Sequence, residues 1–327
     1  MDSSLYRTVT TSRGLAYSVY YCKGSDPAKP TLVFLHGFPS SSYDWRHQVA
    51  YFQLRGHGIV VPDMLGYGQT DKPTDAAQYA ASLLAKDIVD VLDAVQVGER
   101  VIAIGHDWGS RVTSRLASLY ADRFVAVAFL AVGYGVPNTT ATYPQILAHT
   151  ATLAGYELFG YWDFFSAQGA DKIIAEHYNS FWSIAMGLDP ESAKTHFAPT
   201  GALKAWLLED AVLPLPSYLT EEEYSKQKEN FVKSGIAAPL CWYKALTSSV
   251  DMEDSKMIPQ DKYVVNLPVF FGAAKNDAIA LPVLGKGSVQ KFCPNNTIVE
   301  YDAGHWLIWE AKDKLNDDLA NWIDLQN

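Results

Sequence analysis

The sequence predicts an α/β fold in which a mostly parallel central sheet is covered by helices and carries an inserted helical lid. Short, nearly continuous apolar runs alternate with amphipathic helical patterns up to about residue 136, which indicates buried parallel strands. The next stretch is rich in Trp, Tyr and Phe at helical spacing and lacks a convincing buried strand. We therefore expect a core formed by residues 1–136 and 247–327, with a helical cap at 137–246.

Each expected element follows from its own pattern. Two strands at 5–10 and 15–21 flank Ser12, Arg13 and Gly14 and predict an opening hairpin. Further strands are expected at apolar runs that cover residues 31–35, 58–61, 101–105, 125–132, 264–272 and 297–301. Apolar residues at three and four spacing predict helices, of which the clearest cover residues 79–95, 110–120 and 313–325.

Composition excludes several classes of protein. Apolar residues make up 48% and charged residues 19% of the 327 residues, which predicts a soluble globular chain with a large core. The net charge of −10 argues against nucleic acid and anionic membrane surfaces as partners. The first residues show no secretory signal, and no run is long and apolar enough to span a membrane.

The cysteines and histidines bear on compartment and cofactors. Cys22, Cys241 and Cys293 are too few and too scattered for a disulfide framework or a metal site, so we expect a cytoplasmic protein. The histidines lack metal-ligand spacing and no Gly-rich phosphate loop is visible, so we expect neither a metal nor a cofactor. A monomer and a homodimer are equally compatible with the sequence.

The most informative segment is VIAIGHDWG at residues 101–109, an apolar strand that runs into a tight turn before a helix. Gly105 and Gly109 suit this turn, because side chains there would clash with the neighbouring backbone. Asp107 then stands at the N-terminus of the following helix, where free amides and the helix dipole favour negative charge. An ionised carboxylate can attack carbon directly and form an ester. The alternative is that Asp107 only caps the helix.

An ester on Asp107 requires a base that activates water and an acid that orients the base. Asp277 follows the expected strand that ends at residue 272, and His305 follows the one that ends at residue 301. The chain order of nucleophile, acid and histidine is that of a triad carried at strand ends. Taken alone, Asp277 would be a turn residue and His305 a structural histidine.

A loop near the N-terminus predicts an oxyanion hole. The segment HGFP at residues 36–39 directly follows the strand TLVFL. The backbone N–H groups of Phe38 and Trp108 can together stabilise the charge that develops when water attacks the ester. The alternative is an ordinary loop after a strand.

These motifs identify a family. HGFP, the DMLGYG stretch at 63–68, GHDWG, the Asp277 loop and GHW at 304–306 resemble the α/β-hydrolase-fold epoxide hydrolases, and the resemblance covers nearly the whole chain. It implies the α/β-hydrolase fold with a cap domain and a covalent aspartyl-ester mechanism. Haloalkane dehalogenases share the same frame, including GHDWG. The core motifs therefore leave open which bond is cleaved.

The family resemblance implies that side chains of the cap determine which bond is cleaved. Epoxide hydrolases of this family carry two cap tyrosines over the nucleophile, which activate the epoxide oxygen. Tyr243 in the segment CWYK matches the second, although Lys244 stands where the family usually has arginine. Tyr161 in LFGYWDFF resembles the first, with Tyr156 and Tyr178 as rival candidates. Each tyrosine could instead serve only to pack the cap.

Three functions remain open at this point. The first is an ether-bond hydrolase that turns a small apolar epoxide and water into a vicinal diol. Its substrate would contact Phe38, Trp108, Phe159 and Trp306. The second is a haloalkane or haloacid dehalogenase that forms the same ester; haloalkane dehalogenases typically carry asparagine where Phe38 stands, and phenylalanine offers a halide no side-chain donor. The third is a ligand-binding member of the fold without catalytic activity.

Overall fold

An eight-stranded sheet lies at the centre of the molecule. In a computed structural model that describes residues 1–326, the strands are β1 (Tyr6–Thr10), β2 (Ala16–Cys22), β3 (Thr31–Leu35), β4 (Gly58–Pro62), β5 (Val101–His106), β6 (Ala126–Leu130), β7 (Val269–Ala274) and β8 (Asn296–Tyr301). Their order across the sheet is β1-β2-β4-β3-β5-β6-β7-β8. The pairs β1–β2 and β2–β4 are antiparallel, and all the others are parallel. The predicted hairpin and mostly parallel sheet are confirmed.

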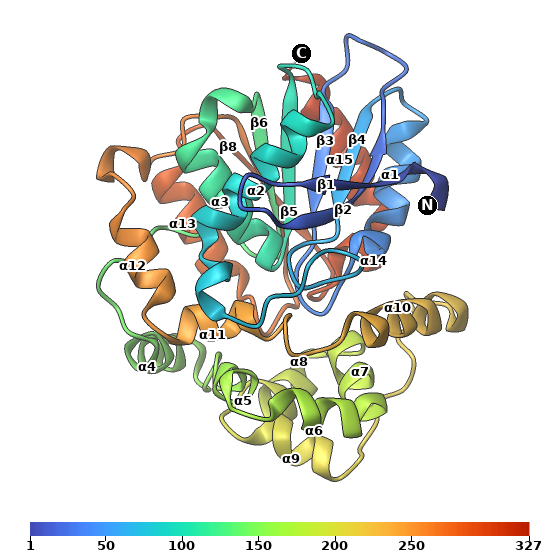
Figure 1. The fold of residues 1–327 in the computed structure, drawn as a ribbon. Helices are drawn as coiled ribbons and strands as arrows, with labels where there is room; N and C mark the ends of the chain where they lie inside the picture. Colours follow the sequence, from blue (N-terminus) through green and yellow to red (C-terminus); the bar gives the residue numbers. More distant parts are fainter. Residues whose placement is uncertain (327) are drawn as a thin grey trace.

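Helices cover the sheet in two layers (Figure 1). Those that flank the strands are α1 (Arg46–Gln53), α2 (Ala81–Ala94), α3 (Trp108–Leu119), α13 (Pro282–Phe292), α14 (Leu307–Glu310) and α15 (Lys312–Asp324). Helix α3 packs against α2 and β5, whereas α15 packs against α1 and β7. Short 3₁₀ turns are η1 (Ser3–Leu5), η2 (Ser42–Trp45), η3 (Ala76–Tyr79), η4 (Ala121–Arg123) and η6 (Gln260–Lys262). Covering both faces explains why the parallel strands β5, β6 and β7 are buried along their whole length.

The chain between β6 and β7 forms a cap of helices beyond one end of the sheet (Figure 1). Its elements are α4 (Tyr143–Ala154), α5 (Tyr161–Ser166), α6 (Ala170–Glu176), α7 (Tyr178–Met186), α8 (Pro190–Ser192), the π-helical turn η5 (Ala193–Phe197), α9 (Ala202–Leu208), α10 (Glu221–Ser234) and α11 (Cys241–Thr247). Helix α12 (Val250–Lys256) then leads back to the core. The cap limits of 137 and 246 stay a prediction.

Two strands differ from their predicted limits for local reasons. β6 ends at Leu130 rather than at residue 132, because Ala131 has a φ of 61°, which an extended strand does not allow. β7 begins at Val269 rather than at residue 264. Pro268 stands directly before it and has no N–H to donate to a strand ladder.

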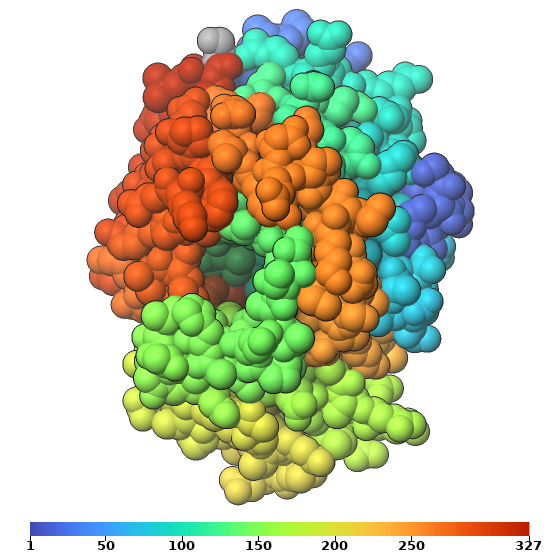
Figure 2. Space-filling view, turned by 90° about the vertical axis from the view of Figure 1, so that its left-hand side faces the viewer, coloured from blue at the N-terminus to red at the C-terminus, as the bar shows by residue number. Residues whose placement is uncertain are grey.

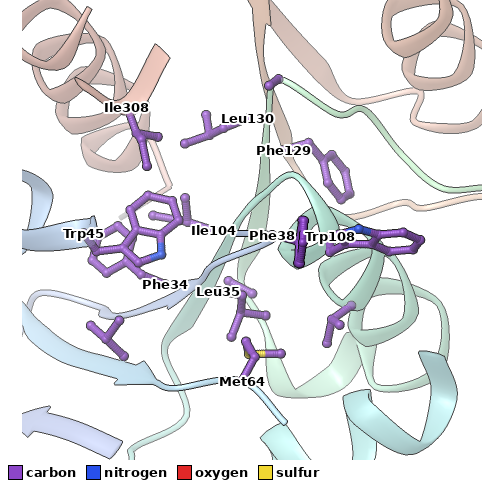
Figure 3. Close-up of a cluster of buried hydrophobic side chains, with 14 of the residues drawn as sticks. Phe34, Leu35, Phe38, Trp45, Met64, Ile104, Trp108, Phe129, Leu130 and Ile308 are labelled. Carbon is purple, nitrogen blue, oxygen red and sulfur yellow. The ribbon is translucent and has the colours of Figure 1, made fainter. Parts of the chain in front are cut away.

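The buried core extends from the middle of the sheet to the end that faces the cap. Figure 3 shows Phe34, Ile104 and Phe129, which come from neighbouring strands β3, β5 and β6 and are fully buried. Phe38 and Trp108 belong to the same cluster but lie just beyond the ends of β3 and β5. Because their rings are anchored in the core, the backbone that carries them is held in place.

Candidate active site

The turn that carries Asp107 is strained. Asp107 has φ and ψ angles of 54° and −123°, a region that residues with a side chain rarely adopt. A Cβ added to Gly105 would collide with the backbone of Gly109, and one added to Gly109 would collide with the carbonyl of Leu35. Glycine is therefore required on both sides of Asp107. The turn presents the carboxylate at the N-terminus of α3.

Backbone amides surround the Asp107 carboxylate. Oδ1 accepts a hydrogen bond from the Phe38 N–H at 2.9 Å, and the Trp108 N–H also donates to the carboxylate. Burial raises the pKa of Asp107, whereas the charge of His305 and the two amide bonds favour the ionised form. The other oxygen, Oδ2, lies 3.6 Å from His305 Nε2. The two oxygens thus face different groups: Oδ1 the Phe38 amide, Oδ2 the imidazole.

His305 lies between two carboxylates. Its Nδ1 is 2.7 Å from Asp277 Oδ2, while Asp277 Oδ1 accepts the N–H groups of Ile279 and Ala280 at 2.9 and 2.8 Å. Burial alone would lower the pKa of His305, but the charges of Asp277 and Asp107 outweigh it and raise that pKa to about 9. Burial likewise opposes ionisation of Asp277, yet His305 and the amide bonds hold its pKa below the usual range.

Two further residues hold the turn around His305. The Glu310 carboxylate accepts the N–H groups of Gly304 and Trp306 at 2.7 and 3.2 Å. His106 Nε2 lies 2.8 Å from the His305 carbonyl oxygen. Burial lowers the pKa of His106 to about 3, so its ring is neutral and Nε2 donates. Neither Glu310 nor His106 was predicted from the sequence. The available signals were that His106 directly precedes Asp107 and that Glu310 follows His305 by five residues.

Two cap tyrosines face the carboxylate. Tyr161 begins α5 and Tyr243 lies on α11, and both line a small cavity together with Asp107 and His305. Their ring centroids are 6.0 Å apart, and Phe165 packs edge-on against both rings. Burial is the main reason that the pKa of each phenol lies far above its ordinary value. Both hydroxyls are therefore neutral and can donate a proton or a hydrogen bond.

The rival tyrosines are committed elsewhere. The Tyr156 hydroxyl donates to the Ala278 carbonyl, outside the cavity that holds Asp107. The Tyr178 hydroxyl donates to the Lys228 carbonyl at 3.2 Å. Of the four candidate tyrosines, the structure brings only Tyr161 and Tyr243 to the carboxylate's cavity.

A carboxylate on a strained turn and a histidine–aspartate pair at later strand ends point to one group of proteins. Residues 30–312 match the family model described as the alpha/beta hydrolase fold. The chain belongs to the alpha/beta hydrolase fold family. The α/β-hydrolase fold implied by the sequence motifs is thereby confirmed.

Relatives of this α/β hydrolase are named epoxide hydrolases. Epoxide hydrolase B of Mycobacterium tuberculosis is 27% identical over 91% of this chain and 92% of its own length. An epoxide hydrolase of solved structure from an endophytic Streptomyces is 27% identical, with a TM-score of 0.81 over 98% of this chain and 95% of that one. The rat bifunctional epoxide hydrolase 2 is 26% identical over 91% of this chain, which spans only 52% of the rat protein. The predicted resemblance to epoxide hydrolases is confirmed.

A cavity of about 180 Å³ adjoins Asp107 and His305. Asp107 and His305 form its polar end, and Trp108, Phe159 and Leu284 are among its mostly apolar walls. Figure 2 shows a deep hollow, bounded by the cap on one side and by α12 and the C-terminal part of the chain on the other. Phe38 and Trp306, the other predicted substrate contacts, line the smaller cavity beside the tyrosines.

Two further findings concern metals and membranes. Within residues 1–326, no three His, Cys, Asp or Glu side chains lie together in a way that could hold a metal ion. The same range contains no helix of the length and apolar character needed to cross a bilayer. Its three cysteines are all free thiols.

Proposed function

We propose that the protein is an epoxide hydrolase that converts an epoxide and water into a vicinal diol through a covalent ester on Asp107. The observation that carries the proposal is the shared cavity of Tyr161, Tyr243, Asp107 and His305. An epoxide oxygen leaves carbon as an alkoxide, which is a poor leaving group without an acid. Two neutral phenols opposite a carboxylate supply that acid, whereas a halide would need no proton.

In the first step, Asp107 Oδ2 attacks a ring carbon while the carbon–oxygen bond of the epoxide breaks. The electron pair of that bond moves to the oxygen, which Tyr161 and Tyr243 hold and to which one of them gives its proton. Asp107 Oδ1 keeps its bond to the Phe38 N–H and becomes the carbonyl oxygen of the ester. The first step therefore leaves a hydroxyalkyl ester and one tyrosinate.

Ester formation changes the charge beside His305. In the free protein two carboxylates raise the pKa of His305 to about 9, so the ring is protonated at neutral pH. The ester removes the negative charge of Asp107, and the pKa of His305 falls. The ring can then pass its proton through solvent to the tyrosinate, which becomes a neutral tyrosine again. Only the neutral ring can act as a base.

In the second step, neutral His305, oriented by Asp277, takes a proton from water, and the hydroxide attacks the ester carbonyl carbon. The negative charge collects on Oδ1, where the Phe38 and Trp108 amides stabilise it. The tetrahedral intermediate collapses, the bond between the carbonyl carbon and the diol oxygen breaks, and His305 returns the proton to that oxygen. The diol is then free, and the remaining proton of the water passes from the new carboxyl group to His305, which restores the Asp107 carboxylate and the protonated ring of the free protein.

A paired assay tests the proposal against its two alternatives. The protein is incubated with styrene oxide and, separately, with 1-bromobutane, and diol and bromide are measured. We expect diol from the epoxide. Bromide without diol would overturn the proposal in favour of a dehalogenase. Neither product would favour a ligand-binding protein of this fold, in which the same pocket holds a ligand without turning it over.

A further inference from the structure

Arg111 lies at the boundary between the catalytic cavity and a second one. It follows Asp107 by four residues on α3, which corresponds to about 6 Å along the helix axis. It lines the 180 Å³ cavity of the carboxylate and also a neighbouring cavity of about 370 Å³. Trp162 and Leu246 line both cavities as well. The two spaces therefore share one wall, and Arg111 is its charged member.

The two cavities differ in the polar side chains that line them. The catalytic cavity is mostly apolar apart from the reacting groups and Arg111. The second lies between the start of α4 and the segment that joins α11 to α12, and polar side chains furnish much of its lining: Asn138, Thr142, Thr247, Ser248, Ser249 and Asp251. A molecule that extends from Asp107 past Arg111 would thus meet further hydroxyl, amide and carboxylate groups, set in walls that are still mostly apolar.

The guanidinium of Arg111 has donors to spare. Its ionic partner is Asp251, and both side chains are largely buried, with 18% and 8% of their surface exposed. Asp251 contacts Nη2, and within residues 1–326 no hydrogen bond joins the other guanidinium nitrogens of Arg111 to another group, although a guanidinium carries five N–H donors. A cation in a cavity wall with unused donors is suited to an acceptor oxygen.

Arg115, one turn further along α3, provides the contrast. It is fully buried and donates to the Gly135 carbonyl at 2.8 Å and to the Ser255 hydroxyl at 3.3 Å. Burial lowers its pKa to about 10. Arg115 therefore ties α3 to the loop after β6 and to α12. Arg111 has no such role beyond its contact with Asp251.

We propose that Arg111 and the polar side chains of the cavity beside it form a subsite for an acceptor oxygen of the substrate. The inference rests on the proposed epoxide hydrolase function and narrows its substrate class. The preferred substrates are epoxides that carry a carboxylate or a neutral oxygen several bonds away from the oxirane ring. The ring lies at Asp107 in the apolar cavity, and the distant oxygen accepts hydrogen bonds from Arg111.

Three epoxides of equal chain length test the subsite: 1,2-epoxyoctane, 7,8-epoxyoctan-1-ol and 7,8-epoxyoctanoate. The measured quantity is the kcat/KM of each oxygen-bearing epoxide divided by that of 1,2-epoxyoctane. We expect this ratio to favour the oxygen-bearing epoxides in the parent and to fall roughly tenfold in Arg111→Leu, as expected for losing a hydrogen bond to a charged group. A ratio raised for the carboxylate alone identifies an anion subsite; a ratio raised for both identifies a general acceptor subsite.

Asp251→Asn is the matched control. It breaks the same ion pair but leaves Arg111 in the wall, so the ratio should stay at or above the parent value. An equal fall in both variants, or an unchanged ratio in Arg111→Leu, means that the pair only docks α12 onto α3 and overturns the subsite.

A binding measurement separates failure of the subsite from failure of the proposed function. If the parent consumes none of the three epoxides, the epoxide hydrolase proposal fails. Octanoate then probes the subsite alone: it should raise the Tm of the parent and of Asp251→Asn but not of Arg111→Leu. No octanoate-dependent rise in the parent, in the absence of turnover, overturns the subsite.

Discussion

The edge of the sheet and the cap hold their chemical groups in different ways. At the sheet edge, Asp107, Asp277 and His305 are fixed by charged hydrogen bonds and backbone amides. In the cap, Tyr161 and Tyr243 are positioned by ring contacts with their aromatic neighbours. The charged carboxylates and imidazole must be held at defined points, which requires directed hydrogen bonds. A tyrosine hydroxyl that serves as an acid needs only to stay neutral and close to the leaving oxygen. In the proposed mechanism the cap tyrosines act in ester formation alone, whereas the sheet edge supplies the nucleophile and then hydrolyses the ester.

The largest expected effect comes from removing the base at the sheet edge. His305→Gln removes the base, so turnover should fall by roughly 10⁴-fold while the ester on Asp107 still forms. Intact-protein mass spectrometry of the variant with styrene oxide should therefore show a gain equal to the mass of the epoxide. The parent, which releases its ester, serves as the control. The absence of an adduct on the variant, beside an active parent, would count against Asp107 as the nucleophile.

Removing the hydroxyls of the two cap tyrosines should block ester formation, the first step. Tyr161→Phe and Tyr243→Phe each remove one hydroxyl and keep the ring packing, so each should slow ester formation by roughly 10²-fold. The double variant should nearly abolish it, as measured by single-turnover formation of the adduct in the His305→Gln background. Tyr156→Phe is the matched control, because its hydroxyl is bonded outside the cavity. Epoxide turnover that survives the double change would refute the assignment of the cap tyrosines.

The smallest expected effect concerns the influence of the Asp107 charge on the pKa of His305. Asp107 raises the pKa of His305, so Asp107→Ala should titrate this ring at a lower pH than the value of about 9 in the parent. NMR titration of the imidazole measures both values. In the parent, the raised pKa stabilises the folded state fully below the ordinary value of 6.5, and this contribution disappears as pH rises through about 9. Equal pKa values in both proteins would contradict the proposed charge-dependent switch.

Local patterns were sufficient for most of the fold. The apolar runs at β3 and β5 match the observed strands because a strand buried on both faces leaves a continuous apolar signature. The same logic failed at the ends of β6 and the start of β7. There a single left-handed residue, Ala131, and a single proline, Pro268, override the apolar run. Periodicity does not record such one-residue interruptions.

The site residues likewise divide into those that local patterns could predict and those that they could not. Asp107, Asp277 and His305 were predictable as candidates because parallel strands direct their carboxyl ends to one edge of the sheet. Glu310 and His106 were not, because they act through backbone groups of the His305 turn, and backbone bonding leaves no trace in side-chain spacing. Arg111 was missed for another reason: its one-turn distance from Asp107 was visible, but the cavity on its far side was not.

By itself, the sequence determined the fold class and the identity of a carboxylate, an acid and a histidine at strand ends, because these depend on local patterns and chain order. Only the tertiary structure decided which tyrosines share a cavity with Asp107 and that Arg111 lies in the wall between two cavities. Both are matters of how the cap packs over the sheet. Such packing brings together residues that are distant in the chain and have no common spacing, so no local pattern could record it.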